Sequence, residues 1–433
     1  MIKQLISKLR QFGKEGLFHI FGSKVIAQVG GLISSMVVVR FLDKAEYGYY
    51  VDAWNLYSYP AIFVGMGMTN VILQYCSERT TDERKASIYR HALVIGNAAN
   101  FLVVAVTLAL ALWQFWIGES KTALYLVLMC GLPFICYLDS FAQTVLRIKL
   151  KNHVFSNANM IYSGVLLLGN IVLTRFFDIP GLIYSRYLSY FVATVICVAA
   201  LQKERFFGKI MAEGKRLEGE DRRKINNYAS ICAITNFTST VLTLLDVTCL
   251  DLVMHDPTVL ADYHVAAVIP SACAFVPSSL MVFFYPKLVA AISEGKKEGR
   301  AFIFNMAKIY AVVNGFVYVC LALFAPLIIW IIYGEKYMNV IPLFQILSLN
   351  YLFYCVRNLM GNTIAAIKKV KINLIFAIFS GVLNIVLNML LIPWLGSVGA
   401  AVATLTVTIV IAIMDCGYVM HYFKMENQGK SCW

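Results

Sequence analysis

The chain has 433 residues, of which 60% are hydrophobic and 14% are charged, and its net charge is +13. Soluble domains have about 45–50% apolar and about 25% charged residues, so this composition excludes an ordinary soluble globular protein. The apolar excess is too large for one core surrounded by water, and it indicates a chain that faces lipid.

Twelve segments are long and apolar enough to cross a bilayer, which takes about 20 residues of helix. We therefore predict an all-α integral membrane protein with about twelve transmembrane helices. The connection between the fifth and sixth segments is so short that these two are expected to form a hairpin. In chain order the segments are 17–40, 46–75, 91–116, 123–146, 154–176, 181–201, 228–254, 260–286, 302–332, 339–366, 371–393 and 397–421.

Positive charge is distributed unevenly between the two sides of these spans. Lys and Arg concentrate in both tails and in the loops after spans two, four, six, eight and ten, with eight of them between Lys203 and Lys224. The positive-inside rule then places both termini in the cytoplasm, which agrees with an even number of spans. The opposite side has only Lys44, Lys121 and Lys336, with Arg40 and Arg175 at its margin.

The chain is predicted to consist of two lobes of six spans each. Segment 1–16 is either an amphipathic helix on the membrane surface or a solvated tail. It is followed by an N-lobe at 17–201, a charged cytoplasmic linker at 202–227, a C-lobe at 228–421 and a cytoplasmic tail at 422–433.

An internal repeat supports this division into lobes. The sequence Ser163-Gly164-Val165-Leu166 recurs 217 positions later as Ser380-Gly381-Val382-Leu383, and Gly181 roughly matches Gly399. Because both halves would start in the cytoplasm, the lobes are predicted to be parallel repeats about an axis along the membrane normal. Transporters of this design place a binding cavity between the lobes and work by alternating access.

Cationic side chains within the spans are candidates for binding an anionic substrate. Insertion of such a charge costs about 2.5–3.5 kcal/mol, so it should face protein or a water-filled cavity. Arg357 is about nine residues, or about 13 Å, from the cytoplasmic end of its span. A phosphate or pyrophosphate head group is the ligand that such cations favour. The alternative is that they form internal salt bridges, or, for Arg186 and Lys308, that the side chain snorkels to the interface. The candidates are Lys24, Arg357, Arg186 and Lys308.

Three acidic residues within the spans, Asp52, Asp139 and Asp246, are candidates for binding a coupling proton or sodium ion. No nucleotide-binding loop, nucleophile motif or metal-ligand spacing is present in the sequence, and the eleven cysteines are scattered singly. We therefore expect neither an enzyme nor a bound cofactor or metal, and no nucleic-acid partner.

Several short patterns, taken in order, resemble one family of membrane proteins. Val38-Val39-Arg40-Phe41-Leu42 followed by Glu46-Tyr47-Gly48-Tyr49-Tyr50 is similar to the span one to span two junction of Wzx-type polysaccharide-biosynthesis flippases. This family is part of the multidrug/oligosaccharidyl-lipid/polysaccharide exporter superfamily. Asp246, Tyr263 and three further segments resemble later family patterns: Tyr285-Pro286-Lys287-Leu288, Gly334-Glu335-Lys336-Tyr337 and Leu395-Gly396-Ser397-Val398-Gly399-Ala400-Ala401.

The resemblance implies a two-lobed flippase with a cationic central cavity in the bacterial inner membrane. Its implied substrate is an undecaprenyl-pyrophosphate-linked oligosaccharide, such as an O-antigen or capsule repeat unit, moved from the cytoplasmic to the periplasmic leaflet. Membrane lipid, a glycan polymerase and chain-length proteins are the implied partners. The alternatives are a multidrug or toxin exporter of the same superfamily, a membrane glycan polymerase and a non-transporting scaffold.

Overall fold

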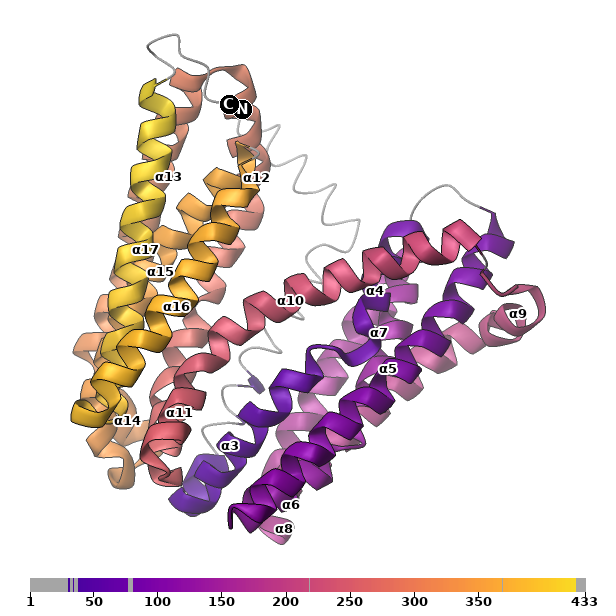
Figure 1. The fold of residues 1–433 in the computed structure, drawn as a ribbon, viewed down its shortest axis with the longest axis horizontal. Helices are drawn as coiled ribbons and strands as arrows, with labels where there is room; N and C mark the ends of the chain where they lie inside the picture. The colour runs from indigo at the N-terminus through magenta and orange to yellow at the C-terminus, as the bar shows by residue number, and fades with distance from the viewer. Residues whose placement is uncertain are drawn as a thin grey trace. The chain divides into compact units, whose positions relative to one another are not determined.

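The computed structural model describes residues 30, 31, 34, 38–76, 81–217, 219–367 and 369–425. Within these residues every regular element is a helix, so the predicted all-α class is confirmed there. The described chain forms two compact units, 1–241 and 242–433, and the division falls within helix α10 (Gly219–Met254) (Figure 1). The lobe and linker boundaries drawn from the sequence stay a prediction.

The first unit is built from helices that pack mainly as neighbours along the chain. Among them, α7 packs along α8, and α5 packs against α6 and the short helix η1. Its elements before α10 are α3 (Lys44–Ala61), η1 (Val64–Gly67), α4 (Met68–Tyr75), α5 (Asp82–Trp116), α6 (Ser120–Met129), α7 (Leu132–Ile148), α8 (Asn152–Gln202) and α9 (Phe206–Glu213).

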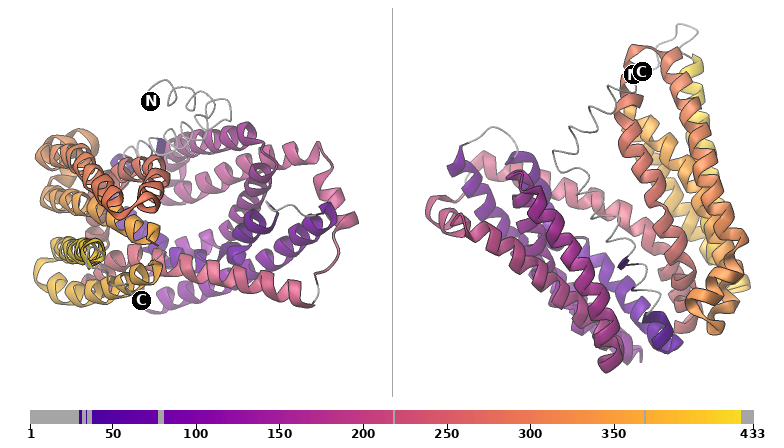
Figure 2. Two further views of the ribbon diagram at one scale, coloured as in Figure 1. Left: turned by 90° about the horizontal axis from the view of Figure 1, so that it is seen from above. Right: turned by 180° about the vertical axis from the view of Figure 1, so that it is seen from behind.

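In the second unit, α15 packs against both α13 and α17, and α16 packs along α17 (Figure 2). Its elements after α10 are α11 (Pro257–Cys273), α12 (Phe275–Glu294), α13 (Lys296–Leu323), α14 (Ala325–Tyr333), η2 (Glu335–Val340), α15 (Ile341–Ala366), α16 (Val370–Leu395) and α17 (Ser397–Met425).

Each unit has its own core and presents large apolar side chains on its outside. Tyr137 is buried at the centre of the first core, where its hydroxyl donates to the carbonyl of Ala92 at 2.5 Å. The outer faces expose side chains such as Phe101 of α5, Phe316 of α13 and Ile375 of α16. Exposed apolar belts of this kind, on helices that satisfy their own backbone, fit a lipid environment.

Nine helices of the described part are long and apolar enough to span a membrane, and the chain is a multi-pass membrane protein. One of the nine, 153–202, contains both the fifth and the sixth predicted spans. Predicted span 17–40 falls mostly outside the described residues, as does segment 1–16. Predicted span 228–254 lies in α10, which is not among the nine. The count of twelve and the side of the termini therefore stay predictions.

The expected hairpin between spans five and six is present inside α8. Asp178 has φ 50° and ψ −133°, which reverses the chain. A Cβ at Gly181 would lie 2.3 Å from the carbonyl oxygen of Leu173, so the two arms approach too closely for any other residue.

The same turn occurs again 218 positions later. Gly396 has φ 58° and ψ −136°, and a Cβ at Gly399 would lie 2.4 Å from the carbonyl oxygen of Leu391. The match between Gly181 and Gly399 that the sequence suggested is therefore a match of backbone geometry.

Replacing Gly181 by Ala should destabilise the first hairpin, because the new methyl group overlaps a backbone carbonyl that cannot move aside. We expect a loss of about 1–3 kcal/mol, read as a lower apparent Tm of the detergent-solubilised protein. Gly164→Ala, in the same helix, is the matched control, because a Cβ there meets nothing within 4 Å. Equal apparent Tm values for the two variants would contradict the close approach.

Candidate functional site

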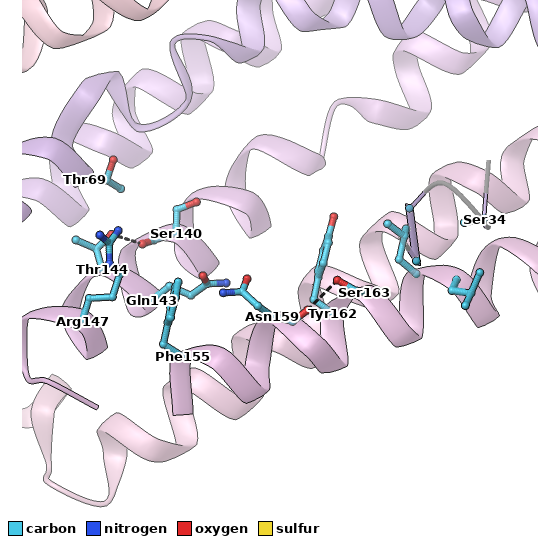
Figure 3. Close-up of a pocket in the computed structure, with 14 residues that line it drawn as sticks. Ser34, Thr69, Ser140, Gln143, Thr144, Arg147, Phe155, Asn159, Tyr162 and Ser163 are labelled. Atoms are coloured by element: carbon cyan, nitrogen blue, oxygen red, sulfur yellow. Dashed lines mark hydrogen bonds between the residues drawn. The ribbon is translucent and has the colours of Figure 1, made fainter. Parts of the chain in front are cut away.

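The first unit contains a polar cavity of about 490 Å³. Its described walls come from residues 30, 31 and 34 of the first predicted span, from α4, and from one face each of α7 and α8. Hydroxyl and amide side chains predominate, together with one cation and two aromatic rings (Figure 3). The volume lies within the range of small-molecule sites, which is about 300–1,000 Å³, although such sites are usually more apolar.

Helical periodicity positions the lining residues. On α7, Ser140, Gln143, Thr144 and Arg147 recur at i, i+3, i+4 and i+7, which puts them on one face. On α8 the lining residues recur at i, i+4, i+7, i+8 and i+11, which also puts them on one face: Phe155, Asn159, Tyr162, Ser163 and Leu166. The two stripes face each other, and Figure 3 shows the amides of Gln143 and Asn159 pointing toward one another.

Asp139 lies one helical turn before Gln143 and adjoins this cavity. It is buried, and its Oδ2 accepts a hydrogen bond from Gln143 Nε2 at 2.7 Å. Its Oδ1 has no hydrogen-bond partner within the described residues. A buried carboxylate with an unused oxygen is suited to take up a proton or a cation.

Arg186, on the second arm of α8, has aromatic neighbours. Its guanidinium carbon lies 3.9 Å from the ring centroid of Trp54 on α3, and its Nε donates to the hydroxyl of Tyr50 at 3.2 Å. Among the residues that the structure describes, no carboxylate forms an ion pair with it. Arg186 is partly buried, and its charge is therefore held in place without being neutralised.

Asp246 of α10 accepts four hydrogen bonds from three other helices of the second unit. Tyr263 Oη and Thr404 Oγ1 both donate to Oδ2 at 2.6 Å. Asn384 Nδ2 at 3.1 Å and Asn388 Nδ2 at 3.0 Å donate to Oδ1. The buried Oδ1 of Asn388 has no partner in the described part of the chain. Carboxylate, hydroxyl and amide oxygens together are the ligand types that hard cations prefer.

The remaining predicted site residues lie at separate places. Arg357 on α15 is partly buried, and Asp415 on α17 is the carboxylate whose field acts on it. Lys308 is exposed, with its Nζ 4.6 Å from the ring centroid of Phe304. Asp52 is buried on α3. Lys24 lies outside the described residues.

Sequence reasoning missed the polar partners of these charges. The stripe on α7 and the spacing Ser380, Asn384, Asn388 on α16 are both visible as polar residues one turn apart in apolar spans. That signal was available, since i, i+4 pairs share a helix face. Trp54 had no such signal, because interface aromatics are common in membrane helices.

The sequence matches the family described as "Polysaccharide biosynthesis protein" over residues 14–286. It is also 20% identical, over 405 residues, to the uncharacterized membrane protein MJ1068 of Methanocaldococcus jannaschii, covering 89% of this chain and 80% of that protein.

Solved structures share the fold. The inward-facing conformation of a multidrug resistance MATE family transporter of the MOP superfamily is 14% identical with a TM-score of 0.75, covering 94% of this chain and 96% of that chain. The lipid II flippase MurJ, in an inward closed conformation, is 15% identical with a TM-score of 0.69, covering 93% and 87%. A MOP superfamily transporter from Pyrococcus furiosus is 12% identical with a TM-score of 0.62, covering 94% of each chain. With this fold and a family match over more than half of its length, the chain belongs to the polysaccharide biosynthesis protein family.

Proposed function

We propose that this protein is an alternating-access flippase that moves an undecaprenyl-pyrophosphate-linked oligosaccharide, such as an O-antigen or capsule repeat unit, from the cytoplasmic to the periplasmic leaflet of the bacterial inner membrane. The family match, the multi-pass fold and the likeness to flippase and exporter structures support it. In this role the protein makes and breaks no covalent bond and needs no cofactor.

The observation that carries the proposal is the environment of Arg186. A guanidinium inside a membrane protein is costly unless something compensates it, and a carboxylate partner is the usual compensation. Arg186 instead rests on Trp54 and donates through Nε to Tyr50, so its two terminal nitrogens remain for a ligand. Those nitrogens match two oxygens of a phosphate group. Lys24 and Arg357 remain further candidates for the same head group.

Transport against a gradient needs a coupled ion, and the Asp246 cluster is the best-built place for one. Sodium would be bound by the carboxylate, the two hydroxyl oxygens and Oδ1 of Asn388, in place of the amide donors that face Asp246. Protonation of the carboxylate is the alternative. Asp139 and Asp52 stay candidates for proton uptake in the first unit.

The exporter alternative stays open, because a MATE family transporter has the same fold. A cationic drug would avoid an uncompensated arginine, whereas an anionic pyrophosphate would seek one. The lipid-linked glycan pool of cells without this protein separates these two functions.

Cells without this protein should accumulate a complete lipid-linked repeat unit on the cytoplasmic leaflet. Mass spectrometry of the polyprenol-linked oligosaccharides measures the accumulation, and a sidedness assay on spheroplasts locates it. Repeat units that reach the periplasm unpolymerised would indicate a polymerase instead. An unchanged lipid-linked glycan pool would favour an exporter or a scaffold.

Arg186→Ala should fail to restore flipping in those cells, with a loss of about tenfold or more, the size of one charged hydrogen bond. Arg186→Lys keeps the charge but not the fork, so it should restore flipping in part. Arg84→Ala is the matched control, since Arg84 is exposed and pairs with Asp221 at 3.4 Å. Full restoration by Arg186→Ala would remove Arg186 from substrate binding.

Sodium should raise the apparent Tm of the purified protein relative to choline at equal ionic strength, because a cation that binds only the folded state stabilises it. Sodium at about ten times its dissociation constant would contribute about 1.4 kcal/mol. Asp246→Asn should abolish the shift, and Asp221→Asn, at an exposed position, should keep it. A sodium shift that survives Asp246→Asn would place the cation elsewhere.

A further inference from the structure

Arg147, which lines the cavity of the first unit, has no role in the function proposed so far. Arg147 ends the polar stripe of α7, at the end of the helix that the charge distribution places toward the cytoplasm. Its neighbours in sequence, Lys149 and Lys151, both form ion pairs with Glu204. These two lysines hold the pKa of Glu204 down at about 2. The two lysines therefore share one carboxylate in a partly buried cluster that fastens α7 to the end of α8, whereas Arg147 is exposed.

Arg147 is different from these lysines. It forms no ion pair among the described residues, and its guanidinium carbon lies 5.7 Å from the ring centroid of Phe155. It also lines the cavity of the first unit, at the opposite end from Ser34 (Figure 3). It is the cationic member of the described lining, and its charge is available to an anion that occupies the cavity.

The middle of the cavity has the groups that recognise neutral hydroxyls. Gln143 Nε2 is held by Asp139, which leaves Gln143 Oε1 to accept a hydrogen bond. Asn159, opposite to it, contributes an amide with both donor and acceptor atoms, and none of these makes a hydrogen bond to another described residue. Tyr162 and Phe155 supply ring faces on the same side. A cation followed by paired amides and aromatic rings matches a sugar bonded to a phosphate.

We propose that this cavity is the cytoplasm-facing loading site for the phosphate-linked sugar of the glycan, in which Arg147 binds the phosphate and Gln143 and Asn159 bind the sugar hydroxyls. The inference rests on the proposed function and names the part of the substrate that the first unit selects. It makes Gln143 and Asn159 specificity-determining residues for the first sugar.

Depth along α8 separates this site from Arg186. Asn159 is seven residues from the start of α8, about 10 Å, whereas Arg186 follows the reversal at Asp178 by eight residues, about 12 Å from the opposite side. Tyr162 and Tyr190 lie between them, with ring centroids 4.9 Å apart. The head group would therefore meet Arg147 first and Arg186 later in transport.

The test measures the binding of defined lipids to the purified full-length protein in nanodiscs. The probes are farnesyl pyrophosphate, the same lipid carrying glucose, galactose, N-acetylglucosamine or N-acetylgalactosamine, and the repeat-unit lipid extracted from cells without this protein. We expect at least one sugar-bearing probe to bind about tenfold more tightly than farnesyl pyrophosphate.

Asn159→Ala and Gln143→Ala should remove that sugar-dependent increment and leave the affinity for farnesyl pyrophosphate unchanged. Arg147→Ala should weaken every probe by about tenfold, whereas Arg84→Ala should weaken none. Arg147→Ala should elute on size exclusion like the wild-type protein, which separates a lost contact from misfolding. Arg147→Lys keeps the charge but not the fork. It should bind with intermediate affinity.

The proposal is overturned if Arg147→Ala binds like Arg84→Ala, or if the increment survives both amide variants. It is also overturned if the wild-type protein binds none of the sugar-bearing probes, although cells without the protein accumulate the lipid-linked repeat unit. In these cases the flippase function stands and only the loading site fails. If no lipid-linked glycan accumulates in the cells, the proposed function fails independently of this site.

Discussion

The cost of placing a charge inside an apolar protein governs how this chain uses its polar residues. Each deep charge is stabilised in a different way. Arg186 rests on an aromatic ring and a tyrosine hydroxyl, Asp246 accepts four neutral donors, and Arg357 lies in the field of a carboxylate on a neighbouring helix. The first two charges have neutral partners, whereas a carboxylate of a neighbouring helix acts on the third. The three charges are therefore stabilised by three different kinds of partner.

The internal repeat shows how one geometry serves two purposes. Asn170 and Asn388 are 218 positions apart, and each contacts the first helix of its own unit. Asn170 donates to the hydroxyl of Ser34 at 2.6 Å, whereas Asn388 donates to the carboxylate of Asp246 at 3.0 Å. The contact is neutral in the first unit and charged in the second. An equivalent position is thus a packing contact in one copy and part of a candidate cation site in the other.

Much of the fold follows from the sequence, because hydrophobic length and helical structure are tightly linked in lipid. The apolar segments, the hairpin at Asp178 and the equivalence of Gly181 and Gly399 were all predictable. The number of spans was harder to predict, because α10 combines many polar residues with its apolar ones. The charges at the candidate sites could also be picked out, because an ionisable residue in an apolar span is conspicuous.

Their partners were harder to predict from the sequence, because partners come from distant helices. Asp246 meets Asn384 and Thr404 only after four helices have packed. The sequence alone identifies Arg147 as an ordinary topological charge, and its place in the cavity lining and the pairing of Lys149 and Lys151 with Glu204 distinguish it. One-turn spacing of polar residues within apolar helices is the pattern that would have revealed both.

The two reversals share a geometry but not a residue, and this makes the two hairpins unequal. Gly396 adopts its positive φ freely, whereas Asp178 adopts φ 50° with a side chain present. A residue with a side chain in this sparsely populated backbone region costs about 1–3 kcal/mol. The first hairpin therefore carries backbone strain at its turn that the second hairpin avoids.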